Sequence, residues 1–166
     1  IIIFLDGFDS TINGSLDTAM ERFKKRNDKL LFSKHPDTFY GLDKLVYTAG
    51  KNNMILNSGM YMGYVKYLKI VLKEALKLKD SDDQILINKI AKKISFISID
   101  DKEEIFKNIS NFKKIEDEIL KSDAVFFSTP GTLSYNRILR SFTEYGQFFL
   151  PYLIIIYLIG KEMIRK

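Results

Sequence analysis

The chain has 166 residues, which is the size of a single domain with a substantial hydrophobic core. Having no cysteine and one histidine, it cannot form disulfides, thiolate zinc sites or cysteine nucleophiles, and histidine-rich metal sites and a Ser-His-Asp triad are disfavoured. The net charge of +5 comes from basic residues interspersed with acidic ones, and this pattern argues against a nucleic-acid partner.

Residues 1–5 are large and apolar, and Asp6 and Asp9 follow them. An uninterrupted apolar run predicts a strand buried on both faces, as in a parallel sheet. Ligands of open α/β sheets bind beyond the carboxyl ends of the strands, and a turn through Gly7 would bring Asp9 beside Asp6. Two converging carboxylates are typical of a site for a hard divalent cation. The alternative is structural: Asp6 ends the strand, and Asp9 caps a turn together with Ser10.

The following elements alternate between helices and strands. Polar residues 11–14 predict a turn, and Ser15 predicts the N-cap of an amphipathic helix that begins at Leu16. By the same reasoning we expect strands at 30–33, 54–56, 95–99 and 124–127, an extended segment at 105–112, helices at 65–76, 81–93 and 114–121, and a loop at 34–53. This alternation predicts an α/β fold with a mixed, largely parallel sheet flanked by helices.

Asn57, Ser58 and Gly59 form a polar segment after a short strand. Such a segment predicts a turn between a strand and a helix, in which the glycine supplies a positive φ. Alternatively, Gly59 and Gly63 flank bulky residues because the backbone passes close to a ligand or to another strand there.

Residues 80–84 form the acidic segment DSDDQ. Ser81 and Gln84 match a capping box, and two further acids, Asp82 and Asp83, would favour a helix N-terminus electrostatically. Capping does not require so many acids. An acidic helix start that faces a cleft could instead supply a catalytic base or bind the hydroxyls of a sugar.

Other features favour structural roles. His35 precedes Pro36, and we expect it to be a loop residue rather than a ligand. Four tyrosines could stack on a base or a sugar ring, although packing is the expected role: Tyr40, Tyr47, Tyr61 and Tyr64. Residues 148–159 are almost wholly apolar but too short to span a bilayer. They predict a buried helix or interface, or alternatively a segment on a membrane surface.

The order of these segments resembles the glycosyltransferase domain of the lysyl hydroxylase and procollagen glycosyltransferase group. The resemblance is carried by FLDGFD at 4–9, Phe32-Ser33, LNSGMYMG at 56–63, DSDDQ at 80–84, ISID at 97–100 and IFKN at 105–108. It covers residues 1–131, and the ordered series is more specific than any one of its segments.

The resemblance implies a GT-A nucleotide-sugar transferase fold that uses manganese and a UDP-sugar donor. By position, Asp6 and Asp9 would be metal ligands that bridge to the donor diphosphate. Carboxylate and phosphate oxygens suit manganese, which would offset the charge that develops on the UDP leaving group. Asn57, Ser58 and Gly59 would line the sugar or acceptor side of the site.

The resemblance also implies an acceptor side. Asp82 and Asp83 would form an acidic cluster near a protein or glycan acceptor, with Asp83 closer to the reacting hydroxyl. Members of the group suggest a glucosyl or galactosyl donor, a hydroxylysine-type acceptor and a location in the secretory pathway.

Two departures from the family pattern stand out. The family's third metal ligand, a histidine in an H-G-N-G-like segment, corresponds here to Ser128. The half of the family domain that grips the uridine would lie before Ile1, and because the chain does not begin with Met we expect a piece of a longer protein. We therefore expect residues 1–131 to be the carboxyl-terminal portion of a GT-A domain and residues 132–166 to be a helical, apolar tail that could contact a membrane.

Two other functions stay open. A degenerate or truncated glycosyltransferase-like domain would bind a partner without activity, and the missing histidine and the apolar tail favour that alternative. A haloacid-dehalogenase-like phosphatase also places an aspartate after its first strand, but its D-x-D-x-T signature requires an acid where this chain has Phe8.

Overall fold

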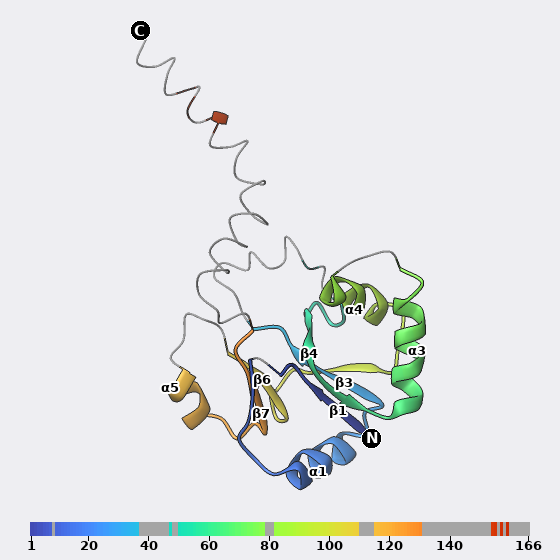
Figure 1. Cartoon of the computed structure of the whole chain (residues 1–166), viewed down its shortest axis with the longest axis vertical. Coiled ribbons are helices and arrows are strands. Elements are labelled where there is room, and N and C mark those ends of the chain that lie inside the picture. The colour runs from blue at the N-terminus through green and yellow to red at the C-terminus, as the bar shows by residue number, and fades with distance from the viewer. Residues whose placement is uncertain are drawn as a thin grey trace. The chain divides into compact units, whose positions relative to one another are not determined.

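The computed structural model describes residues 1–7, 9–36, 47, 50–78, 82–109 and 115–130, together with residues 154, 155, 157 and 159. The chain divides into two compact units, Ile1–Pro130 and Gly131–Lys166. The helices and strands of the first unit are labelled in Figure 1. In chain order they are β1 Ile2–Leu5, β2 Ser10–Ile12, α1 Leu16–Arg26, β3 Leu30–Lys34, β4 Leu56–Gly63, α3 Val65–Ala75, α4 Asp83–Ala91, β5 Ile97–Asp100, β6 Phe106–Asn108, α5 Ile115–Leu120 and β7 Phe126–Ser128.

The larger sheet has the strand order β1-β4-β3-β5 and is mixed. β4 runs antiparallel to β1 and to β3, whereas β3 and β5 run parallel. The carboxyl ends of β1, β3 and β5 therefore lie at the edge of the sheet where β4 begins. The predicted mixed α/β fold is confirmed. The expectation of a largely parallel sheet is wrong for the described strands, because the antiparallel β4 lies inside the sheet.

β1 is a strand, as predicted, but it is not buried on both faces. Ile2 and Phe4 are 41% and 44% exposed, while Ile3 and Leu5 on the other face are half-buried against the core. Among the described strands β1 pairs with β4 alone. The Phe4 ring stacks on Tyr61 of β4, with 4.8 Å between ring centroids. An apolar run predicts a strand, but it does not report how many layers cover that strand.

The smaller sheet has the order β2-β7-β6. β2 pairs antiparallel with β7, and β6 pairs parallel with β7. The turn predicted at residues 11–14 is therefore wrong in its first half, because Thr11 and Ile12 form a ladder with Phe127 and Phe126. Three-residue strands have too little sequence pattern to be recognised before their partner strand is known.

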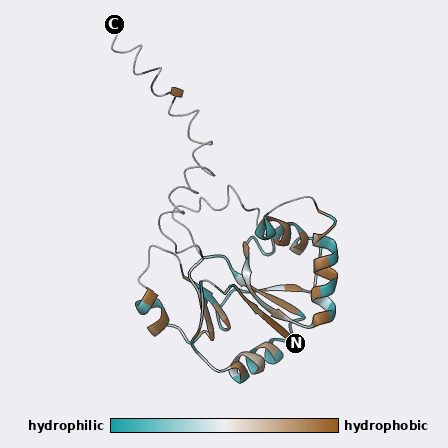
Figure 2. Ribbon diagram, viewed as in Figure 1, coloured by the Kyte–Doolittle hydropathy of each residue, from teal (hydrophilic) through white to brown (hydrophobic). Residues whose placement is uncertain are grey.

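Two hydrophobic clusters form the core on either side of the larger sheet. α3 and α4 cover one face, as Figure 1 shows, and that cluster consists of Leu30, Phe32, Leu56, Leu68, Val71, Ile87, Ile90, Ala91, Ile97 and Ile99. On the other side α1 and the smaller sheet contribute to a cluster of Ala19, Phe23, Leu31, Met60, Met62, Ile105, Phe106, Val125 and Phe126. Figure 2 shows mostly apolar strands and helices that carry both apolar and polar residues. Each fully buried large side chain stabilises the fold by about 1.5–3 kcal/mol.

The ends of α1 follow from its sequence. The Ser15 hydroxyl accepts a hydrogen bond from the Thr18 amide at 3.0 Å, which confirms the predicted N-cap. At the other end Asn27 has φ 57°, in the left-handed region that terminates helices. The predicted helices at 65–76 and 114–121 are confirmed as α3 and α5.

The predicted apolar tail lies almost wholly outside the described residues. Ile154, Ile155, Tyr157 and Ile159 are described and are exposed. In the described part of the chain, no helix has the length and apolar character needed to cross a membrane. The loop predicted at 34–53 and Tyr40 also fall mainly or wholly outside the described residues.

Candidate functional site

The segments that sequence analysis singled out meet at one edge of the fold. Asp6 follows the carboxyl end of β1, Ser33 lies near the carboxyl end of β3, and Asn57 lies near the start of β4. Asn108 ends β6, and its side-chain amide donates hydrogen bonds to Ser33 Oγ at 3.0 Å and to the Lys34 carbonyl at 2.6 Å. These two bonds join the smaller sheet to the larger one. We call this edge, defined by Asp6, Asp9, Ser33, Asn57, Asp83, Asn108 and Ser128, the motif edge.

The Asn57-Ser58-Gly59 segment forms a bulge inside β4 rather than the predicted turn. Phe32 of β3 lies opposite Tyr61, but the next residue, Ser33, lies opposite Asn57, so residues 58–60 have no partner in β3. Gly59 donates its amide hydrogen to Asn57 Oδ1 at 2.8 Å. A Cβ at Gly59 would lie 2.9 Å from that oxygen, which belongs to the same strand. The predicted close approach to another strand is confirmed at Gly63, where a Cβ would lie 2.9 Å from the Leu30 Cα of β3.

Asp6 is anchored to this bulge by its backbone. Its amide donates to the Gly59 carbonyl at 2.8 Å, which extends the β1–β4 ladder by one residue beyond Leu5. A Cβ added to Gly59 would be 3.7 Å from the Asp6 Cβ. Asp6 is exposed, and its side chain begins next to the bulge.

Two amides of α4 fix this helix to the start of β4. Asn88 exchanges two hydrogen bonds with the backbone of Leu56, at 2.8 and 2.9 Å. One turn earlier, Gln84 Oε1 accepts from Asn57 Nδ2 at 3.3 Å, and Gln84 Nε2 lies 3.1 Å from His35 Nδ1. Because Gln84, Asn88 and Asn57 are at most 8% exposed, these bonds are shielded from water and hold the start of α4 beside the bulge.

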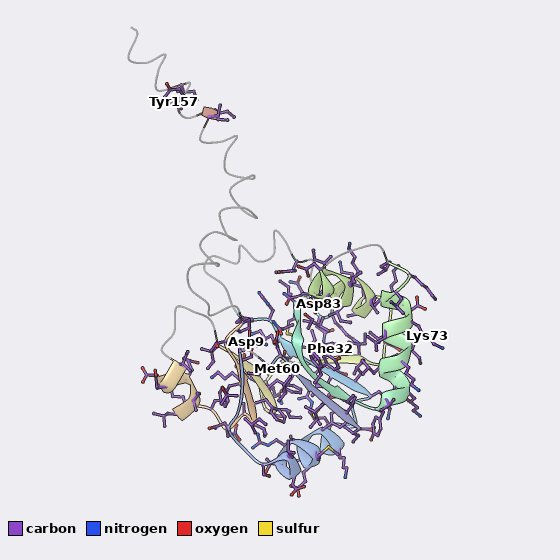
Figure 3. The ribbon with its side chains drawn as sticks, viewed as in Figure 1. Asp9, Phe32, Met60, Lys73, Asp83 and Tyr157 are labelled. Atoms are coloured by element: carbon purple, nitrogen blue, oxygen red, sulfur yellow. The ribbon has the colours of Figure 1, made fainter. Side chains whose placement is uncertain are left out.

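Asp82 and Asp83 have different roles at the start of α4. Asp82, not Ser81 as predicted, is the N-cap, and its carboxylate accepts from the Ile85 amide at 2.9 Å. Asp83 is the first helical residue and is exposed. Burial raises the pKa of Tyr61, and the negative charge of Asp83 raises it further. Figure 3 labels Asp83 where α4 begins.

Asp9 is held by the smaller sheet. Its carbonyl accepts from the Thr129 amide at 3.0 Å, and its carboxylate accepts from Ser128 Oγ at 3.2 Å. Ser128, which is 2% exposed, is the residue for which the resemblance predicts the position of the family's third metal ligand. The structure thus brings that position into contact with Asp9, although the two residues are 119 positions apart in the sequence.

The donor set at the motif edge consists of oxygens. Carboxylates and hydroxyls suit Mn²⁺ or Mg²⁺, and the residues present are chemically suited to such an ion. Within the described ranges no group of three or more acidic or histidine side chains could hold a metal ion together. A cation at Asp6 and Asp9 would therefore complete its coordination with water or phosphate oxygens. That Asp6 and Asp9 share one ion stays a prediction.

Two buried polar atoms in the described part of the chain have no hydrogen-bond partner, Ser10 Oγ and Asn108 Oδ1. Both residues lie opposite Ser128 in the smaller sheet, Ser10 on β2 and Asn108 on β6. Buried polar atoms are nearly always paired, so these two mark a place suited to a polar ligand or water. Sequence analysis gave no role to Asn108, Ser33 or Asn88. The available signal was a polar side chain at the end of an apolar strand or inside an apolar helix face.

The described tyrosines pack as expected. Tyr61 lies between Phe4 and Phe32, and Tyr64 contacts Phe23 and Tyr67.

Comparison with known proteins identifies the family. The profile of the PLOD GT domain matches residues 1–142. The chain is 27% identical over 166 residues to procollagen-lysine,2-oxoglutarate 5-dioxygenase of Drosophila melanogaster, covering 89% of this chain and 23% of that protein. It is 26% identical over 131 residues to the human multifunctional procollagen lysine hydroxylase and glycosyltransferase LH3, covering 74% of this chain and 17% of LH3. The chain thus spans about a fifth of the length of these relatives, and it belongs to the PLOD glycosyltransferase domain family.

Proposed function

We propose that this chain contributes the metal and acceptor side of a glycosyltransferase that moves a hexose from a UDP-sugar to a hydroxyl acceptor. The observation that carries the proposal is that bonds between segments far apart in sequence hold Asp6 at the Gly59 bulge, the start of α4 at Asn57, and Ser128 at Asp9. A relative, LH3, is a glycosyltransferase by name, and this supports the reaction class. A hydroxylysine-type acceptor and a glucosyl or galactosyl donor belong to the same proposal.

The residues divide the task in this proposal. Asp6 and Asp9 hold a divalent cation, which when bound neutralises the charge of the donor diphosphate. Asn57 and Ser58, on the bulge, and the backbone at Gly59 face the sugar. Asp83 is exposed and accepts a hydrogen bond or a proton from the acceptor hydroxyl, whereas Asp82 keeps its carboxylate on the Ile85 amide and shapes the helix start.

One observation favours a second candidate, a glycosyltransferase-like domain that binds a nucleotide sugar or a partner without transferring a sugar. Ser128 offers a hydroxyl where the family pattern has an imidazole, and a hydroxyl is a weaker ligand for a divalent ion.

Contact of residues 132–166 with a membrane and a location in the secretory pathway are further parts of the proposal.

The test is Mn²⁺-dependent hydrolysis of UDP-glucose and UDP-galactose by the protein and by an Asp6→Asn variant. Glu21→Gln, an exposed acid on α1, is the matched control. We expect activity to fall at least about 100-fold in Asp6→Asn and to be unchanged in the control, because loss of a ligand removes charge stabilisation in the transition state. Equal activity in the two variants would contradict the metal assignment. Mn²⁺-dependent UDP binding without turnover would favour the second candidate.

A further inference from the structure

A chain of hydrogen bonds joins the single histidine of the sequence to the proposed metal side of the site. His35 Nδ1 lies 3.1 Å from Gln84 Nε2, and Gln84 Oε1 lies 3.3 Å from Asn57 Nδ2. Asn57 Oδ1 accepts the Gly59 amide hydrogen at 2.8 Å, and the Gly59 carbonyl accepts the Asp6 amide hydrogen at 2.8 Å. The chain thus connects four segments of the sequence and ends at a proposed metal ligand.

The direction of each bond in this chain depends on the next. A side-chain amide donates only through nitrogen and accepts only through oxygen. Asn57 accepts the Gly59 amide hydrogen through Oδ1, so its Nδ2 faces Gln84. Because Nδ2 is a donor, Gln84 accepts through Oε1. Gln84 then presents Nε2 to the ring, so His35 accepts at Nδ1 and carries its proton on Nε2. A ring with a proton on Nδ1 would place a donor against Gln84 Nε2, and reversing Gln84 would only move that donor–donor clash to Asn57 Nδ2.

The surroundings of the ring support a fixed orientation. The His35 amide donates to the Ile55 carbonyl at 2.9 Å, directly after β3, and the residue after it, Pro36, is buried. The ring is half-buried and packs against Tyr47, with 5.5 Å between ring centroids. Since Gln84 and Asn57 are 8% and 5% exposed, water cannot readily replace a lost partner in the chain.

We propose that His35 is a positioning residue: its Nδ1, as an acceptor, stabilises the amide orientation that the Gly59 N–H imposes on Asn57 and, through Asn57, on Gln84. His35 does not touch the reacting groups in this proposal. It acts by holding the donor-facing bulge and the acidic start of α4 in one arrangement. The effect on sugar transfer rests on the function proposed above, whereas the effect on amide orientation does not.

The test uses a pair of substitutions that separates the acceptor from the shape of the ring. His35→Phe keeps an aromatic ring against Tyr47 but has no acceptor, and His35→Asn supplies a side-chain oxygen near the position of Nδ1. We expect His35→Phe to shift the NMR signals of the Asn57 side-chain amide and the Gly59 backbone amide, and His35→Asn to restore them. In the wild-type chain, the ¹⁵N signal of Nδ1 should be that of an unprotonated ring nitrogen, and one histidine makes its assignment unambiguous.

Kinetics supply the second readout. We expect kcat for UDP-sugar turnover to fall roughly ten-fold in His35→Phe and to recover in His35→Asn, with the affinity for Mn²⁺ and UDP unchanged, because misplaced groups slow the chemical step. Should His35→Phe fail to fold, Gln84→Met, which removes both bonds of Gln84, should reproduce its effects on Asn57 and Gly59.

The outcomes separate this inference from the proposed function. A protonated Nδ1, or signals of Asn57 and Gly59 that do not change in His35→Phe, would overturn the positioning role whatever the activity. A wild-type protein that folds with the expected Nδ1 and amide signals but does not turn over UDP-sugars would refute the proposed function and leave the amide orientation standing.

Discussion

Two polar clusters in the same unit differ in how completely their groups are paired. Around Asp100, which is fully buried, both carboxylate oxygens are used: Oδ2 accepts from the amides of Ile105 and Phe106 at 2.7 and 2.8 Å, and Oδ1 accepts from Arg26 at 3.3 Å. Burial raises the pKa of Asp100, and these bonds act against that rise. The Asp100 cluster orders the turn between β5 and β6, which is a structural role.

The motif edge is different because it contains a buried polar atom that no hydrogen bond satisfies. Among the described residues, Asn108 Oδ1 and the neighbouring Ser10 Oγ are buried without a hydrogen-bond partner, and Asp6 and Asp83 are exposed. Buried polar atoms without partners do not stabilise the fold. Their location at the same edge as exposed acids is what a ligand site requires. A polar cluster whose buried groups all have hydrogen-bond partners supports the fold. A cluster with a buried polar atom that lacks a partner is suited to binding a ligand.

The largest effect on stability should come from Asp100→Ala. This change leaves Arg26 and backbone amides without their buried acceptor, and we expect a loss of about 3–5 kcal/mol in the free energy of unfolding. Urea denaturation measures it. Asp123→Ala, which removes the surface partner of Arg22, should cost less than about 1 kcal/mol. Similar losses in the two variants would contradict a structural role specific to Asp100.

Asp83→Asn should lower activity strongly and change stability little, unlike Asp100→Ala. We expect turnover of the donor with an added hydroxyl acceptor to fall about 100-fold, or about 2.7 kcal/mol in activation free energy, because a general base is lost. The free energy of unfolding should change by less than about 0.5 kcal/mol, since Asp83 is exposed. Activity assays and denaturation of the same preparation check both values. A stability loss as large as that of Asp100→Ala would place Asp83 with the structural cluster.

Ser128→His tests the metal assignment through an expected gain in Mn²⁺ affinity. The serine contacts the Asp9 carboxylate, so an imidazole there should add a ligand and tighten Mn²⁺ binding about tenfold, or about 1.4 kcal/mol. Isothermal titration calorimetry measures the affinity. Ser128→Asn is the control for size at this buried position, and an equal gain in both variants would show that the imidazole is not responsible.

The smallest effect concerns Tyr61. Removing the negative charge in Asp83→Asn should lower the pKa of Tyr61 but leave it raised, because burial is the first cause of its raised pKa and that charge is the second. NMR titration of ¹³C-labelled tyrosine follows the Tyr61 ring once its signal is assigned among the nine tyrosines. An unchanged pKa would mean that Asp83 does not face Tyr61 and would weaken its placement at the motif edge.

Local patterns predicted much of the fold. The apolar spacing after Ser15 and the stripe that begins at Val65 predicted α1 and α3, because helix periodicity and capping are encoded within a few residues. β2 and the edge position of β1 could not be predicted, since both depend on which strand lies alongside. A continuous apolar run has the same appearance in a central and in an edge strand.

The sequence identified candidate residues of the site, but it did not predict the hydrogen bonds that bring them together. Asp6, Asp9, Asn57 and Asp83 were identified from acids and small polar residues at element ends and from the family resemblance. The bonds that assemble them join distant positions, such as Ser128 to Asp9, and no local pattern reports such a pair. For the same reason Asp82 was grouped with Asp83, although it caps the helix.

Paramagnetic broadening by Mn²⁺ tests the central claim, that the motif edge and not the Asp100 cluster is the ligand site, most directly. In the ¹H–¹⁵N spectrum of the chain with UDP, small additions of Mn²⁺ should broaden the amides of Asp6, Gly59 and Thr129 first, because their bonds anchor Asp6 and Asp9. The amides of Ile105 and Phe106, which donate to Asp100, should broaden last. Earlier broadening at Ile105 and Phe106, or a uniform loss of all signals that Asp6→Asn does not alter, would contradict the account.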